Sequence, residues 1–189
     1  MREGIGTLLP LYLITAHASH TDLTIGYSCQ VMPDDFLLRP LSAGLLLTLP
    51  SGTPQVLCTG VGFGTEKAHI RTEEPLRGEG LTNAIREALA ECGCEIDEMN
   101  FRITDLSGEQ YYFKEASLAV GRTLRKLKEE FDIWHPAECI GEAGALAGVA
   151  IVAVAYAACH KKYALGPNIL LHMANDDGQR AAAIIQFTR

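Results

Sequence analysis

Residues 56–65 read Val-Leu-Cys-Thr-Gly-Val-Gly-Phe-Gly-Thr, and this stretch gives the first indication of the fold. Its apolar, β-prone part, Val56 to Phe63, predicts a strand that ends in a glycine-rich loop. A second apolar stretch, Leu45 to Leu49, comes before it, and residues 50–54 between them read Pro-Ser-Gly-Thr-Pro. Because proline and glycine favour turns, we expect these two strands to be neighbours in a hairpin.

Downstream of this stretch, strand-like and helix-like periodicities alternate. The expected elements are a helix from Leu81 to Gly93, a strand at Phe101 to Asp105, a helix at Lys114 to Phe131, a strand at Ile133 to Ile140, a buried alanine-rich helix at Gly144 to Cys159, and strands at Asn168 to Met173 and Ala181 to Phe187 around the turn at residues 175–178. The order ββαβαβαββ predicts an α/β domain, with a mixed, mostly parallel sheet and helices on both faces. Residues 36–189 form this domain, and residues 1–35 receive no assignment.

Composition and charge narrow the classes of function. The chain has 189 residues, 48% of them hydrophobic, which suits one globular domain with a sizeable core. Its net charge of −7 and the absence of a basic run disfavour binding to nucleic acid, since phosphate contacts require clustered Lys and Arg. The apolar stretch Gly144 to Cys159 is shorter than the roughly 20 residues of a membrane-spanning helix, so we expect no membrane association.

The cysteines indicate a reducing environment. Cys92 and Cys94 are separated by one residue, a spacing that fits neither a CxxC redox motif nor half of a zinc site. We therefore expect scattered, reduced thiols in the cytoplasm, no secretory leader, and neither a metal nor a cofactor. The full set is Cys29, Cys58, Cys92, Cys94, Cys139 and Cys159.

Several strings together resemble one known family. Residues 60–65 (Gly-Val-Gly-Phe-Gly-Thr) are followed by His69, Pro75 and Gly80, and residues 141–148 read Gly-Glu-Ala-Gly-Ala-Leu-Ala-Gly. In this order they are similar to the second half of the β-ketoacyl synthase family of the thiolase superfamily, over Leu37 to Phe187. The resemblance implies a thiolase-like half-domain that a second chain completes to a layered αβαβα arrangement.

The resemblance also implies which positions would carry catalysis. The family uses a nucleophilic Cys from its first half and two His residues from its second half. Here Asp105 and Glu142 stand at the two His positions, and Ala137 matches the family's Lys. The family's last glycine-rich motif corresponds to residues 172–178, His-Met-Ala-Asn-Asp-Asp-Gly. The resemblance thus implies a degenerate active site, because an ionised carboxylate cannot donate a proton to a developing oxyanion.

Other side chains near these positions remain open to more than one interpretation. Asp105, Glu109, Glu138 and Glu142 follow strand ends or precede helices, so they could gather around one pocket for acid–base work; alternatively, Glu142 caps the helix that begins near Gly144. Cys139 could be an activated thiol beside His135 or His172, or a structural cysteine. The remaining binding candidates are His69, at an acyl or pantetheine entrance or merely in a loop, together with Ser107, His172 and Asn175.

Three functional hypotheses follow. The first is a catalytically inactive accessory or structural subunit that resembles a 3-oxoacyl-carrier-protein synthase. The second is a condensing-enzyme or acyltransferase component that is active only with a partner supplying the nucleophilic Cys. The third is a non-catalytic module that binds an acyl thioester or an acyl carrier protein. The expected partner is a second copy of this chain or a chain carrying the first half of the fold.

Overall fold

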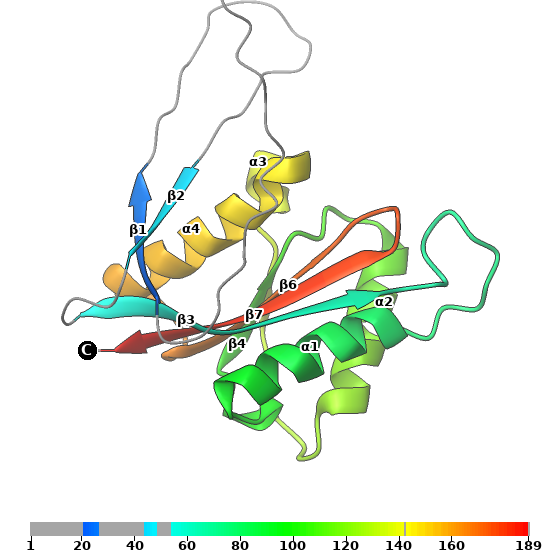
Figure 1. Ribbon diagram of the computed structural model, residues 1–189, viewed down its shortest axis with the longest axis horizontal. Helices are drawn as coiled ribbons and strands as arrows, with labels where there is room; N and C mark the ends of the chain where they lie inside the picture. Colours follow the sequence, from blue (N-terminus) through cyan, green and yellow to red (C-terminus); the bar gives the residue numbers. More distant parts are fainter. Residues whose placement is uncertain (1–20, 27–43, 49–53, 142, 189) are drawn as a thin grey trace, which may run out of the picture.

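The computed structural model describes residues 21–26, 44–48, 54–141 and 143–188 (Figure 1). The strands in these residues form one sheet with the order β2-β1-β3-β7-β6-β4-β5. Their bounds are β1 (Thr21–Gly26), β2 (Gly44–Thr48), β3 (Gln55–Thr65), β4 (Phe101–Thr104), β5 (Ile133–Trp134), β6 (Asn168–Ala174) and β7 (Gln179–Thr188).

The pairing pattern makes the sheet mixed, as predicted. β4 pairs in parallel with both β5 and β6, whereas β7 is antiparallel to β3 and β6, and β1 is antiparallel to β2 and β3. All described strands except β1 and β7 therefore run in one direction. The predicted turn at residues 175–178 joins β6 to β7, with Asn175 N–H bonded to the carbonyl of Gln179 at 3.1 Å.

The predicted hairpin between Leu45 to Leu49 and Val56 to Phe63 is wrong. β1 lies between β2 and β3 in the sheet, with Leu23 opposite Leu47 and Thr21 opposite Cys58. Because β2 and β3 run in the same direction, a short connection cannot pair them, and the intervening strand comes from the part of the chain that the sequence left unassigned.

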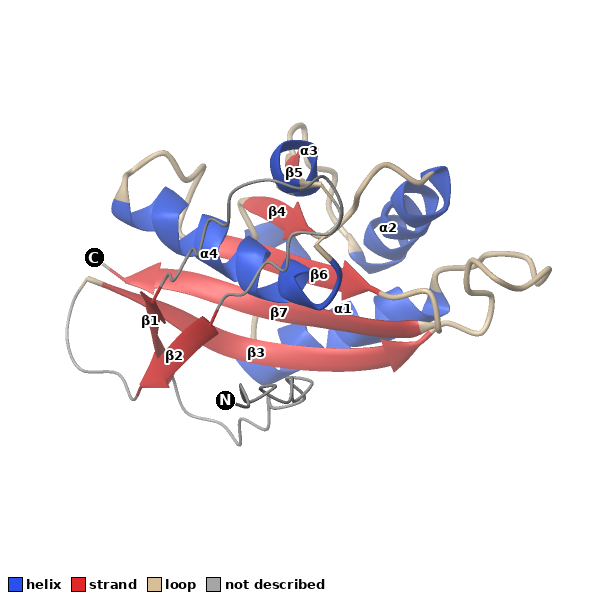
Figure 2. Ribbon diagram, turned by 90° about the horizontal axis from the view of Figure 1, so that it is seen from above, coloured by secondary structure: helices blue, strands red, loops and turns tan. Residues whose placement is uncertain are grey.

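Helices cover both faces of the sheet, as Figure 2 shows. On one face α1 (Glu79–Cys92) and α2 (Gln110–Thr123) enclose a core that includes Leu170 and Ile184. On the other face α4 (Ala147–His160) packs on Phe101, Ile103 and Ile169. Three short helices complete the described elements: Ile96–Glu98, α3 (Ala137–Ile140) and Gly144–Leu146.

Two predicted elements end earlier than their patterns suggested. The helix expected at Lys114 to Phe131 begins at Gln110 and ends at Thr123, and Leu127, expected on its apolar stripe, is 96% exposed. Lys128 instead donates to the backbone carbonyls of Asp97 and Met99, so tertiary contacts draw this segment out of the helix.

The strand expected at Ile133 to Ile140 is also shorter than predicted. It stops after Trp134, and α3 follows directly behind Pro136. The reason is that proline lacks the N–H that a sheet ladder needs.

Helix α1 lies unusually close to β3. A Cβ added at Gly62 would sit 2.1 Å from the carbonyl oxygen of Ala84, far inside any real contact distance. A Cβ added at Gly60 would likewise lie 2.1 Å from the carbonyl oxygen of Ala88, and one added at Gly64 would lie 2.0 Å from that of Gly80. The alternating glycines of β3 thus let the backbone of α1 pack directly on the strand.

The expectation of separate reduced thiols is wrong for Cys92 and Cys94, which are bonded to each other. Gly93 adopts a left-handed conformation with φ of 71° at the end of α1, and the turn leaves the two Cα atoms 5.4 Å apart. Cys58, Cys139 and Cys159 are free, and burial raises the pKa values of Cys58 and Cys159 to about 11.

Candidate functional site

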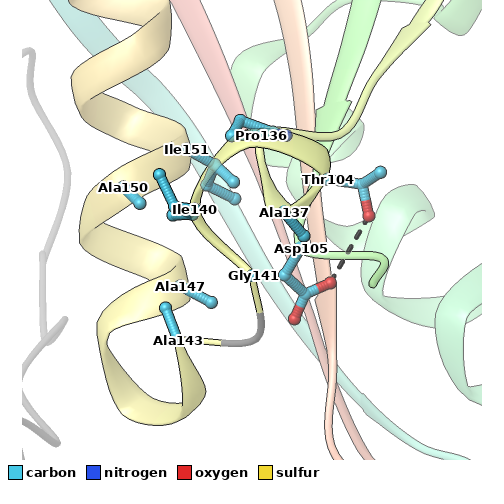
Figure 3. A pocket seen from close by; sticks show the side chains of 10 residues that line it. All are labelled: Thr104, Asp105, Pro136, Ala137, Ile140, Gly141, Ala143, Ala147, Ala150 and Ile151. Atoms are coloured by element: carbon cyan, nitrogen blue, oxygen red, sulfur yellow. Dashed lines mark hydrogen bonds between the residues drawn. The ribbon is translucent and has the colours of Figure 1, made fainter. Parts of the chain in front are cut away.

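A small cavity lies where the end of β4 meets α3 and the start of α4 (Figure 3). It has room for about one water molecule. Its polar groups come from Thr104 and Asp105, and the rest of the lining is mainly apolar. The apolar lining includes Pro136, Ala137, Ile140, Ala147 and Ile151.

Asp105 is the candidate acid that the fold places in this cavity. Its Oδ2 accepts a hydrogen bond from the backbone N–H of Ala174 at 3.1 Å, and its Oδ1 accepts from the hydroxyl of Thr104 at 3.4 Å. Burial raises the pKa of Asp105 to about 6, although both hydrogen bonds oppose that shift. A carboxyl group with such a pKa can exchange a proton near neutral pH, but the described residues that line the cavity beside it include neither a His nor a Cys.

The other candidate acids do not join Asp105 in the described structure. Glu109 is exposed before α2 and accepts a hydrogen bond from the hydroxyl of Ser107 at 2.9 Å. Glu138 lies on α3 with its Oε1 3.3 Å from Nδ1 of His135. Glu142, the other carboxylate at a family position, lies outside the described residues.

His172 is held away from the cavity by the alternation of β6. Leu170 and Ala174, two positions to either side, pack with α1 and α2, while Leu171 packs with α4. His172 therefore projects to the face opposite α4. It is 2% exposed, and burial, with a smaller effect from Arg102, lowers the pKa of His172 to about 3. Its Nε2 is buried and has no hydrogen-bond partner among the described residues.

His69, Asn175 and Cys139 lie in three separate local settings. His69 is in the loop after β3, where its Cδ2 lies 3.4 Å from the position of a Cβ on Gly178. Its Nδ1 is buried and has no hydrogen-bond partner in the described part of the chain. Asn175 holds the turn between β6 and β7, because its Oδ1 accepts from the N–H groups of Asp177 and Gln179. Cys139 is exposed on α3.

The sequence analysis missed a buried ionic cluster at the β6–β7 turn. Nε of Arg180 donates to Oε1 of Glu115 at 2.7 Å, and both side chains are almost fully buried. Glu66 is buried nearby and accepts from the N–H of Gly80 at 2.9 Å, at the start of α1. The helical periodicity could have indicated this cluster, because Glu115 lies on the same buried side of α2 as Tyr112 and Ala119.

The described ranges support neither a metal site nor a membrane-spanning helix. They contain no group of three or more His, Cys, Asp or Glu side chains placed to hold a metal ion. None of the helices described here combines the length and the hydropathy that a membrane span requires.

Solved structures of ketosynthases share this fold. The complex of the ketosynthase ApeO with its chain length factor ApeC from Xenorhabdus doucetiae matches with a TM-score of 0.66 and 15% identity, over 77% of this chain and 42% of that chain. The oxazolomycin ketosynthase domain OzmH of Streptomyces albus matches with a TM-score of 0.65 and 14% identity, over 76% and 50% of the two chains. AntDE:AntF, a type II acyl-carrier protein in complex with its ketosynthase, matches with a TM-score of 0.63 and 14% identity, over 70% and 38%.

These matches establish the predicted fold class: the chain has the fold of a thiolase-like ketosynthase half-domain. It spans between 38% and 50% of the length of the matched chains. No protein-family model matches the sequence, and no curated protein matches it significantly.

Proposed function

We propose that this chain is a ketosynthase-like accessory subunit, catalytically inactive by itself, which pairs with a partner through the outer face of α4. The partner is either a second copy of this chain or a chain carrying the complementary half of the fold. The pairing would complete a layered αβαβα arrangement around α4. One matched structure is a ketosynthase in complex with its chain length factor, which supports partner pairing in proteins of this fold.

The observation that carries this proposal is the composition of α4. The helix reads Ala-Gly-Val-Ala-Ile-Val-Ala-Val-Ala-Tyr-Ala-Ala-Cys-His and is apolar on every side. Ile151, Ala155 and Cys159 are buried against the sheet, and Tyr156 packs against the same cluster, but Val149 is partly exposed and lies outside that cluster. A helix that is apolar all round is typical of an element enclosed between two layers, so its outer face supports a partner there.

The proposed lack of catalysis is supported by the cavity at Asp105. Among the described residues that line it, only Asp105 has a side chain that can exchange a proton near neutral pH, and the space between them has room for about one water molecule. Condensation by the family mechanism needs a nucleophile and donors aimed at the developing oxyanion. Those groups would have to come from a partner.

Sedimentation velocity tests the pairing surface. Val149→Glu places a charge on the outer face of α4 and is expected to weaken association at least about tenfold, because the glutamate would be buried unpaired. Leu127→Glu is the matched control, since Leu127 is 96% exposed on a different segment. Self-association of the wild type would identify a homodimer. A wild type that stays monomeric both alone and with first-half chains would contradict the pairing.

Malonyl decarboxylation assays test the inactive role. We expect no turnover from the chain alone. When the chain is mixed with a partner, we expect the Asp105→Ala variant to give the same turnover as the wild type. Turnover by the mixture that disappears on Asp105→Ala would favour the second hypothesis, an enzyme component completed by its partner. A raised melting temperature with acyl-pantetheine, without turnover, would favour the binding module, because a ligand that prefers the folded state stabilises it.

A further inference from the structure

The edge of the sheet at β3 is only partly covered by the described strands. β7 pairs with β3 from Gln55 to Thr65, but β1 pairs with it only at Leu57 and Cys58. From Gly60 onward, one side of β3 faces no other described strand. An uncovered strand edge presents backbone N–H and carbonyl groups that can pair with a strand from another molecule.

Two glutamates of α1 occupy the N–H groups along this edge. The N–H of Val61 donates to Oε2 of Glu91 at 2.6 Å, and the N–H of Phe63 donates to Oε2 of Glu87 at 2.7 Å. The spacings match: one helical step of four residues rises about 6 Å, and a strand step of two residues spans roughly 6.6 Å. Hydrogen bonds to a charged acceptor are stronger than those between neutral groups.

The glycines of β3 make this reach possible. Because Gly62 has no side chain, α1 approaches so closely that Cβ of Glu87 would lie 2.8 Å from a Cβ on Gly62. At this separation a glutamate side chain can pass around the edge of the strand and meet the backbone.

We propose that Glu87 and Glu91 form an edge clamp that closes β3 to the addition of a further β-strand from another molecule. An incoming strand needs the N–H groups of Val61 and Phe63 as donors, and it would have to displace two carboxylates to reach them. Its own carbonyls would also face those negative charges. Phe63 on the same strand is 56% exposed, and this apolar side chain is one reason why the edge would need such a clamp.

Removing the clamp tests the proposal. Glu87→Ala/Glu91→Ala is expected to strengthen concentration-dependent self-association by about tenfold or more, since it frees two strand donors. Glu73→Ala/Glu74→Ala removes the same charge from exposed loop positions and should leave association unchanged. All variants are compared in the Val149→Glu background by sedimentation velocity, so that pairing through α4 does not contribute.

A reversal and an exchange measurement complete the test. Adding Val61→Pro to Glu87→Ala/Glu91→Ala removes one freed donor at an edge position that tolerates proline, and it should reverse the self-association. In the wild type, amide hydrogen exchange of Val61 and Phe63 should be slowed. Wild-type amides that exchange at the rate of an unstructured chain, or clamp-less variants that associate no more than the Glu73→Ala/Glu74→Ala control, would overturn the proposal. The exchange result does not require the variants to fold.

Discussion

The guanidinium of Arg180 and the carboxylate of Glu115 form a buried ion pair, with Nε donating to Oε1 at 2.7 Å. Arg180 is the second residue of β7 and Glu115 lies in the middle of α2, so the pair ties the helix layer to the sheet. Nη1 of Arg180 also donates to the carbonyl of Asn175 at 2.8 Å. The turn between β6 and β7 is therefore fixed from inside the core.

Breaking this pair should destabilise the fold strongly. Arg180→Leu leaves Glu115 buried without its partner, and we expect a loss of about 3–5 kcal/mol in the free energy of unfolding, measured by urea denaturation. Arg71→Leu is the control, because Arg71 pairs with Asp176 and Asp177 at the surface and its loss should cost less than about 1 kcal/mol. Equal losses in the two variants would contradict a structural role for the buried pair.

His172 should make the fold sensitive to acid. Its folded-state pKa of about 3 lies below the ordinary value of 6.5, so the folded state binds this proton less readily than the unfolded state. Its contribution to stability is complete above about pH 6.5 and falls as the pH drops toward 3, by about 1.4 kcal/mol per pH unit. Urea denaturation of His172→Leu between pH 4 and 7 should show a shallower slope than the wild type; an unchanged slope would show that other groups cause the acid sensitivity.

Asp105 should act in the opposite direction. Burial raises its pKa from 3.8 to about 6, so the folded state holds this proton more tightly, and stability is lost as the pH rises through about 6. Asp105→Asn keeps an oxygen acceptor for the N–H of Ala174 but removes the buried charge. We expect it to stabilise the protein by about 1–3 kcal/mol at pH 8 and to be neutral at pH 4. A variant destabilised at both pH values would show that the carboxylate is favourable in its site.

Gly62 should not tolerate even one methyl group. Gly62→Ala would place a Cβ 2.1 Å from a backbone carbonyl of α1, and the required shift should cost about 3 kcal/mol. Gly121→Ala is the control: it lies in α2 with nothing within 4 Å of its Cβ position, and it should stabilise the helix by up to about 1 kcal/mol. Thermal unfolding of the two variants would refute the close packing if Gly62→Ala melted like the wild type.

The sequence predicted the candidate site only where a residue's position next to a strand or helix decides where its side chain lies. Asp105 follows β4 directly, and strand ends meet at one edge, so its place in the cavity follows from its position in the chain. Glu109 and Glu138 also flank elements, but their side chains bond locally to Ser107 and His135. The side of the sheet to which His172 projects depends on the alternation of β6. The sequence does not indicate that side, because Leu170 and Leu171 are adjacent and equally apolar.

By itself, the sequence determined the positions of most strands and helices from Val56 onward, because apolar periodicity and turn residues act over a few neighbours. It also determined that α4 is apolar on all sides and that the turn at residues 175–178 reverses the chain. Only the tertiary structure decided that β1 separates β2 from β3, that α2 ends at Thr123, and that Glu115 meets Arg180. Each of these depends on contacts between residues far apart in the chain, and such contacts form only when the whole sheet and its two helix layers pack together.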